Sequence, residues 1–192
     1  MSGLTGLPYA RDAGRLAGEA RKLDGAIVTI SNKASGEFIA AVNSNLAAVA
    51  KGQQGAATQF LVHHVQSDAV AFESVKFPGH YLDLKAQTWI NNYRWVRISR
   101  ARKGLVPSLA TPWCVFTVRG GKDLNNVLLN SVAFGDRQIA VTKLYGESKL
   151  VGRLTPRSNP YTNTKYVKQQ GFKDFENMIN EGRFAIHRVS KL

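Results

Sequence analysis

The sequence predicts an all-β domain made of three copies of one unit, and three observations lead to this. From Ala26 onward, short β-branched and aromatic runs alternate with Gly, Pro, Asn and Ser, as in strands separated by turns. A twelve-residue stretch recurs three times, and a shorter aromatic stretch recurs with it. Repetition of this kind indicates copies that pack against one another around a shared core.

The longer recurring stretch reads as a strand, a tight turn and a second strand. Its copies, which align without gaps, are TISNKASGEFIA (29–40), FESVKFPGHYLD (72–83) and LNSVAFGDRQIA (129–140). The alignment superposes three serines before the turn and, after it, an aromatic or Gln position. These are Ser31, Ser74 and Ser131, then Phe38, Tyr81 and Gln138. The turn position holds Gly36, Gly79 and Asp136, and both residue types suit tight-turn backbone.

The shorter recurring stretch closes each copy with a Phe two residues before a Val or Ile. The pairs are Phe60 with Val62, Phe116 with Val118, and Phe184 with Ile186. A period of two buries one face of a strand. The runs NLAAVA, RWVRIS and KLVGRL lie between the two stretches and are expected to form middle strands. The expected repeats are about 26–66, 67–121 and 122–192, with a long loop, TPRSNPYTNTKYVKQQGFKDFENMIN, in the third.

Residues 1–25 differ from this pattern, and we interpret them as a basic N-terminal arm. Within the arm, 10–23 has helical periodicity that places Leu16, Ala20 and Leu23 on one face. The segment lacks the continuous apolar core of a secretory signal, and no apolar run is long enough to span a membrane. We therefore expect a cytoplasmic protein or one secreted by an unconventional route.

The charge balance points to an anionic partner. There are 26 Lys and Arg against 13 Asp and Glu, which gives a net charge of +13. Such a surface attracts sulfated glycans, nucleic acid, anionic membranes or a mineral face. The lone cysteine, Cys114, cannot form an intramolecular disulfide, and its apolar neighbours predict a buried structural thiol.

The stretch NYRWVRISRARKG (92–104) is the strongest candidate for a binding surface. It carries five cations and two aromatic residues without any acid. The candidate ligand-binding residues are Tyr93, Arg94, Trp95, Arg97, Arg100, Arg102 and Lys103. Guanidinium groups bind sulfate and phosphate in pairs of hydrogen bonds, and aromatic faces stack on sugars or bases. On a strand, Val96 and Ile98 would point inward and Trp95 and Arg97 outward. The alternative is a solvated edge strand whose charges discourage pairing with a strand of another molecule.

Signatures of catalysis are missing from the sequence. It contains no Gly-x-Ser-x-Gly elbow, no phosphate-binding glycine loop with Lys-Ser and no His-Glu-x-x-His. Glu73 with Asp83, or Asp123 with Asp136, could in principle act as an acid and base pair, but acids are scarce. The histidines, for which we expect backbone partners rather than a metal, are His63, His64, His80 and His187. No catalytic residue, metal site or cofactor is predicted.

Three copies of a four-strand unit, each with a turn and an aromatic closing strand, resemble a β-trefoil. Residues 72–82, FESVKFPGHYL, resemble the Phe-x-Ser-x-x-x-Pro-x-x-Tyr-Leu signature of interleukin-one-like cytokines. They equally resemble the repeat of arabinofuranosidase-type sugar-binding trefoils. Asp83 and Leu84 then depart from both patterns. The resemblance therefore implies a fold but conveys neither family's ligand.

The function expected from these observations is a non-catalytic binding module for an anionic polymer, with an acidic or sulfated glycan preferred. A self-assembling matrix or mineral-associated protein is the first alternative, and a cytokine-like receptor ligand is the second. Nucleic acid is a possible partner but is not favoured, because only the net charge suggests it.

Overall fold

The computed structural model describes residues 16–88, 93–100, 107–121, 123–135, 137–154 and 180–189, with side chains omitted at 86–88. In this part of the chain there are twelve strands, namely β1 (Ile27–Asn32), β2 (Phe38–Asn43), β3 (Leu46–Ala50), β4 (Phe60–Gln66), β5 (Ala69–Ser74), β6 (His80–Thr88), β7 (Arg94–Arg100), β8 (Phe116–Arg119), β9 (Val127–Ser131), β10 (Arg137–Leu144), β11 (Glu147–Leu154) and β12 (Arg183–Arg188). The helical elements are α2 (Leu16–Lys22) and the 3-10 turns η1 (Gly55–Thr58) and η3 (Pro112–Cys114). The predicted middle strands are confirmed as β3, β7 and β11.

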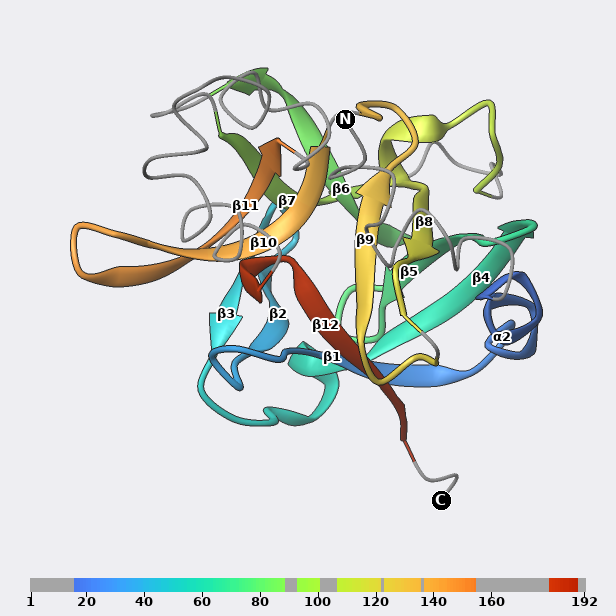
Figure 1. The fold of residues 1–192 in the computed structure, drawn as a ribbon, viewed down its shortest axis with the longest axis horizontal. Helices are drawn as coiled ribbons and strands as arrows, with labels where there is room; N and C mark the ends of the chain where they lie inside the picture. Colours follow the sequence, from blue (N-terminus) through green and yellow to red (C-terminus); the bar gives the residue numbers. More distant parts are fainter. Residues whose placement is uncertain are drawn as a thin grey trace, which may run out of the picture.

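Six of the strands close into a barrel. Antiparallel pairing runs from β1 to β4, β5, β8, β9 and β12, and β12 pairs with β1 again. Closure satisfies the backbone hydrogen-bonding groups that an open sheet would leave at its edges. In Figure 1 the barrel strands cross the centre and right of the molecule.

The other six strands form three hairpins, β2–β3, β6–β7 and β10–β11. The hairpins contact one another through β3, β7 and β11, and they gather on the left of Figure 1. Strands β1–β4, β5–β8 and β9–β12 lie in 26–66, 67–121 and 122–192 respectively. A closed six-stranded barrel with three such hairpins is a β-trefoil, so the predicted fold class is confirmed.

The threefold repetition is clearest in the core. Four positions of the repeat carry a fully buried apolar side chain in all three copies. The equivalent sets are Val28, Val70 and Val127; Ile30, Phe72 and Leu129; Ile39, Leu82 and Ile139; and Phe60, Phe116 and Phe184. Each such side chain contributes about 1.5–3 kcal/mol through burial. The period-2 prediction for the closing strands is thus confirmed.

The ungapped alignment of the three copies is wrong before the first turn. In the barrel register, the conserved closing Phe lies opposite Asn32, Ser74 and Ser131 in the three copies. Ser31 is instead the equivalent of Glu73, because these two residues bridge to Phe38 and Tyr81. The first turn is therefore one residue shorter than the second. The ungapped alignment missed this difference because it matched Ser31 with Ser74 by residue identity.

Asn32, Ser74 and Ser131 all accept hydrogen bonds from N–H groups of the following turn, although their side chains differ. The Phe77 N–H donates to Ser74 Oγ at 3.0 Å, and the Phe134 N–H donates to Ser131 Oγ at 3.0 Å. In the first copy, Asn32 Oδ1 accepts two turn N–H bonds, each at 3.1 Å. Each side chain thus satisfies turn donors that no strand partner reaches. Gly79 continues the second turn with φ +81°, a conformation that favours glycine.

Helix α2 packs against the barrel rather than projecting from it. Leu16, Ala20 and Leu23 are fully buried, as the helical periodicity predicted. The chain is also tied to β4, because the Gly25 N–H donates to Val62 O at 2.9 Å. Residues 1–15 of the predicted arm, and 155–179 of the predicted third-repeat loop, lie outside the described residues. Within the described ranges, no helix is long and apolar enough to cross a membrane.

Candidate functional site

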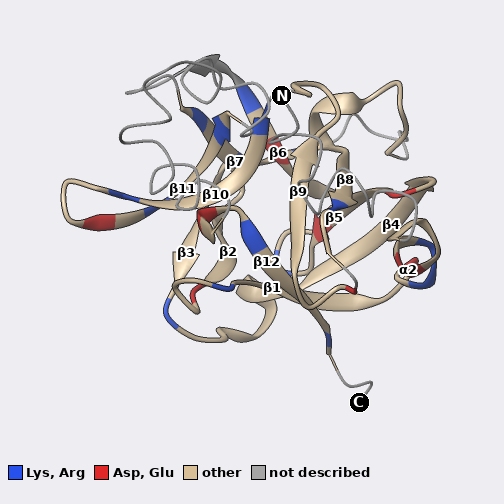
Figure 2. Ribbon diagram, in the orientation of Figure 1, with Lys and Arg blue, Asp and Glu red and all other residues tan. Residues whose placement is uncertain are grey.

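Strand β7 presents the predicted aromatic and basic residues on its outer face. Val96 and Ile98 are buried, and Trp95 and Arg97 alternate with them on the partly exposed side, as predicted. Arg100 ends the strand and is exposed. Arg102 and Lys103 lie outside the described residues. Lys and Arg also occur on β6 and β11 beside this strand (Figure 2).

Three of the predicted residues, Trp95, Arg97 and Arg100, line a hollow of about 430 Å³, here called the β7 hollow. Lys85 of β6 adds a further cation, and the β2–β3 hairpin contributes Asn45 and Leu46. The hollow therefore lies between the hairpins of the first and second repeats. Sequence reasoning missed Asn45, Leu46 and Lys85. The approach of Asn45 and Leu46 depends on how two hairpins pack together. Only the pairing of β6 with β7 could have indicated Lys85.

Asp83 fixes the position of Arg97. The two residues are opposite one another on β6 and β7, and Arg97 Nε donates to Asp83 Oδ1 at 2.7 Å. The Asp83 side chain is 0% exposed, whereas that of Arg97 is 40% exposed. Burial raises the pKa of Asp83, and the hydrogen bond and charge of Arg97 oppose that rise. The Asp83 carboxylate thus offsets part of the positive charge of Arg97. The rest of the positive charge at the hollow comes from Lys85 and Arg100.

Tyr93 and Arg94 serve a different contact. The Arg94 guanidinium lies 3.9 Å from the centre of the Phe134 ring, and its Nη1 donates to Lys85 O at 3.3 Å. Arg153 lies 5.9 Å from the centre of the Tyr93 ring. The two ring contacts join Tyr93 and Arg94 to the third repeat. The structure therefore places Trp95, Arg97 and Arg100 together at the hollow, with Tyr93 and Arg94 outside its lining.

A second polar cluster surrounds Glu73. Its carboxylate contacts His63 Nε2 at 2.7 Å, and it accepts hydrogen bonds from Tyr81 Oη at 3.2 Å and the Gly79 N–H at 3.0 Å. Burial acts to raise the pKa of Glu73, but these bonds and the His63 charge together lower it. Burial and the Glu73 charge raise the pKa of Tyr81 to about 12. The cluster fastens the second turn to the barrel.

Two of the described histidines have the backbone partners that were predicted. His64 Nε2 lies 2.8 Å from Ser67 O, and His80 Nδ1 lies 3.2 Å from Pro78 O. The prediction is wrong for His63, whose partner is the Glu73 carboxylate. The cause is the strand pairing, which brings β4 beside β5 so that Glu73 lies within reach.

Cys114 is buried, as predicted, with 5% of the residue exposed. Its Sγ donates to Thr111 O at 3.3 Å. Burial raises the pKa of the thiol, with the hydrogen bond to Thr111 acting in the opposite direction. Cys114 is therefore a packing residue next to Tyr81, Ala71 and Val115.

Comparison with known proteins yields fold relatives only. No family model and no curated protein matches the sequence. Three similar solved structures are the BEL β-trefoil (14% identity, TM-score 0.56, covering 86% of this chain and 94% of that chain), the designed threefold-symmetric ThreeFoil (10%, 0.57, 86% and 100%), and an endo-β-galactosidase from Clostridium perfringens that releases GlcNAcα1-4Gal (12%, 0.57, 86% and 33%). Identities this low establish the fold alone. The chain is a β-trefoil protein.

Proposed function

We propose that the protein is a non-catalytic binding module for an acidic or sulfated glycan, which it binds in the β7 hollow. One observation carries the proposal, namely that Trp95 shares this hollow with the cations Lys85, Arg97 and Arg100. The hollow is of the size that suits one or two sugar units. The net charge of +13 would attract a polyanion to the surface before it docks.

The chemistry of the lining matches the two faces of such a ligand. Guanidinium and ammonium groups bind sulfate or carboxylate through charge-assisted hydrogen bonds. The Trp95 ring and the exposed Leu46 offer apolar surface to the C–H face of a sugar ring. The Asn45 amide can donate to one hydroxyl group and accept from another.

Glycan is preferred over nucleic acid because of the shape and content of the site. Proteins that bind single strands use several aromatic rings along an extended basic groove. The described lining of the β7 hollow has one aromatic ring, Trp95, and includes Asn45 and Leu46 from the neighbouring hairpin. The endo-β-galactosidase named above contains the same fold in a protein that acts on a glycan, which supports the preference by analogy.

The contacts of the acidic residues support a role without catalysis. Glu73 is held by His63, Tyr81 and a turn N–H, and Asp83 is fully buried against Arg97. A general acid or base must reach the substrate proton directly or through one water molecule. Glu73 instead stabilises the β5–β6 turn, and Asp83 stabilises the β6–β7 hairpin.

The test measures binding of the full chain to heparin, polygalacturonate and single-stranded DNA at two salt concentrations. Arg100→Ala should weaken heparin binding and lower its salt dependence by about one counterion. Trp95→Ala should weaken heparin binding about tenfold without changing that salt dependence. Arg21→Ala on α2 is the matched control, because it removes the same charge outside the hollow.

Equal losses for Arg21→Ala and Arg100→Ala would refute the assigned site, since binding would then follow net charge alone. Tighter binding to DNA than to both glycans would refute the ligand class. Light scattering of each sample reports on the self-assembly alternative. Growth of particles with concentration in the absence of any polyanion would favour that alternative.

A further inference from the structure

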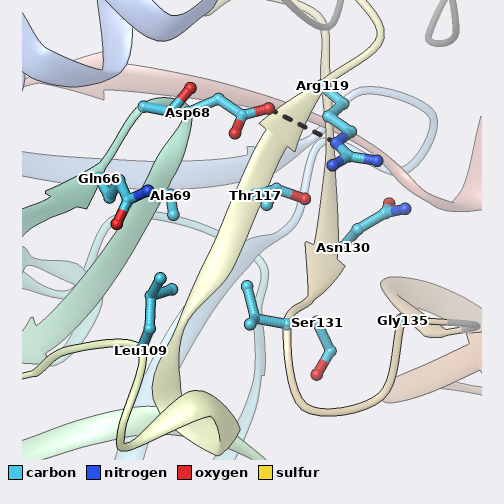
Figure 3. A pocket seen from close by; sticks show the side chains of 11 residues that line it. Gln66, Asp68, Ala69, Leu109, Thr117, Arg119, Asn130, Ser131 and Gly135 are labelled. Atoms are coloured by element: carbon cyan, nitrogen blue, oxygen red, sulfur yellow. Dashed lines mark ion pairs between the residues drawn. The ribbon is translucent and has the colours of Figure 1, made fainter.

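A second hollow, of about 340 Å³, lies on the outer face of the barrel and shares no lining residue with the β7 hollow. Figure 3 shows it between the β4–β5 turn and the outward side chains of β8 and β9. We call it the β8–β9 hollow. Its polar lining includes Gln66, Asp68, Thr117, Arg119 and Asn130, and its apolar lining includes Leu109 and Val132.

The threefold repeat explains why this place is open. Thr117 pairs with Asn130 as Leu61 pairs with Glu73, so Asn130 is the equivalent of Glu73 in the next repeat. Where the first repeat meets the second, His63 of β4 with Glu73 of β5 and Tyr81 of β6 occupies the corresponding place. Asn130 is shorter than Glu73 by one methylene group, and β8 has Thr117 where β4 has Leu61. The place that the Glu73 cluster occupies between β4 and β5 therefore corresponds to the hollow between β8 and β9.

The polar groups in the β8–β9 hollow are held in place by the fold. Asp68 Oδ2 lies 3.5 Å from Arg119 Nε, and these side chains are 13% and 42% exposed. The Asp68 carbonyl accepts from the Val118 N–H at 2.8 Å, which fixes the turn against β8. Asn130 Oδ1 is buried and has no hydrogen-bond partner within the described part of the chain. A buried acceptor of this kind is costly unless a donor is supplied to it.

These groups select a ligand by its hydrogen-bonding pattern rather than by charge. The Asp68–Arg119 pair carries no net charge. An anion in the hollow would be repelled by Asp68, and a cation would be repelled by Arg119. A hydroxyl group both donates and accepts, so adjacent hydroxyls can donate to Asp68 and accept from Arg119 without separating the pair, with the Asn130 amide lining the hollow beside them. Leu109, which is 48% exposed, supplies an apolar wall for the other face of the ligand.

We propose that the β8–β9 hollow binds a neutral polyhydroxylated molecule of hexose size. This site is independent of the anionic site in the β7 hollow, and it differs from that site in its charge, its position and its lining. A small ligand of about a dozen heavy atoms in a preformed hollow of this kind binds with a Kd of about 1 mM.

Nuclear magnetic resonance titration of the full chain tests the proposal. The probes are methyl α-glucoside, methyl β-galactoside, methyl α-mannoside and myo-inositol, with glycine as a zwitterionic comparison. At least one polyol should cause saturable shifts at the backbone amides of Asp68, Thr117 and Asn130. Asn130→Leu replaces the amide in the lining with an apolar side chain of similar size, and Thr117→Val removes one hydroxyl at constant shape. Each should weaken binding, with a loss of about tenfold or more for Asn130→Leu.

Arg100→Ala is the matched control and should leave the polyol shifts unchanged, whereas Asn130→Leu should leave heparin binding unchanged. The proposals for the two hollows can therefore be refuted independently of each other. Thr117→Val carries the test if Asn130→Leu does not give a dispersed, folded spectrum. The proposal is overturned if no polyol gives saturable shifts at these amides, if the shifts persist in the folded variants, or if glycine binds there more tightly than every polyol.

Discussion

Arg97 Nε donates to Asp83 Oδ1 at 2.7 Å, across the pair of strands that presents the β7 hollow. The carboxylate is fully buried, while the guanidinium is 40% exposed. One edge of Arg97 thus faces the interior and another faces the hollow. Asp83, one of the two residues that depart from the cytokine and sugar-binding patterns, therefore orients the central cation of the proposed site.

The first prediction concerns the stability of this pair. Arg97→Ala leaves the Asp83 carboxyl buried without its cation, so we expect a loss of about 2–3 kcal/mol at pH 7. This is less than for a fully buried pair, because Arg97 is partly exposed. Urea unfolding measures the change. Adding Asp83→Asn to Arg97→Ala should recover part of the loss. Strictly additive effects of the two substitutions would show that the pair is not coupled.

The exposed Arg100 provides the comparison for that experiment. Arg100→Ala should change the free energy of unfolding by less than about 0.5 kcal/mol, as surface substitutions usually do. It is therefore the cleaner variant for binding measurements, since any weakening of heparin binding cannot come from a destabilised hairpin. A loss as large as that of Arg97→Ala would show that Arg100 has a structural role of its own.

The second prediction concerns the pH dependence that Glu73 confers. Its pKa is lowered from 4.5, so the native state favours the charged form. The stability gained is complete above pH 4.5 and is lost as the pH falls through the lowered pKa. Glu73→Gln should therefore destabilise the protein by about 1–3 kcal/mol at pH 7. The difference from the wild type should shrink at acid pH.

Unfolding curves collected between neutral and acid pH measure this difference. Glu37→Gln, on the β1–β2 turn, makes the same change of charge without the bonds to His63, Tyr81 and Gly79. It should leave the free energy of unfolding nearly unchanged at neutral pH. A deficit in Glu73→Gln that stays constant, or grows, as the pH falls would contradict the assigned role of the charge.

The third prediction concerns Cys114. Because burial covers the thiol and raises its pKa, alkylation of the native protein by iodoacetamide should be slow at neutral pH. Labelling should accelerate in step with unfolding as urea is added, because only opening of the structure exposes the thiolate. Mass spectrometry follows the modification. Rapid, complete labelling without denaturant would show that this region of the second repeat opens readily.

Much of the fold could be predicted from the sequence because the core repeats at fixed positions. Phe60, Phe116 and Phe184 are recognisable as one position from the alternation around them, and they are equivalent in the structure. The same alternation separated inward Val96 from outward Trp95 on β7. Local periodicity carries this information, because a strand directs successive side chains to opposite faces.

The features that the sequence did not predict depend on register and on packing between repeats. Asn45 lines the same hollow as Arg97 only because two hairpins pack together, and nothing near either residue in the sequence indicates that approach. The partnership of Asp83 with Arg97 depends on the register of β6 and β7, which is irregular between Leu84 and Thr88. The β8–β9 hollow likewise arises from a difference between equivalent positions, which becomes visible only once the barrel pairing is known.

The fourth prediction uses that pairing to test the corrected alignment. Ser74→Ala and Ser131→Ala each remove one bond to a turn N–H and should each cost about 1 kcal/mol. Asn32→Ala should cost about 2–3 kcal/mol, because Oδ1 accepts two turn bonds and Nδ2 donates to Glu181 O at 2.8 Å. Denaturant unfolding of the set gives the comparison.

Ser31 decides between the two alignments. If it were the equivalent of Ser74, as residue identity suggests, Ser31→Ala would cost the same as Ser74→Ala. The barrel register instead makes Asn32 the equivalent, so Ser31→Ala should change the free energy of unfolding by less than about 0.5 kcal/mol. Asn32→Ser should also be more stable than Asn32→Ala, because a serine at that position can accept one of the turn bonds. A large loss for Ser31→Ala with little for Asn32→Ala would restore the ungapped alignment.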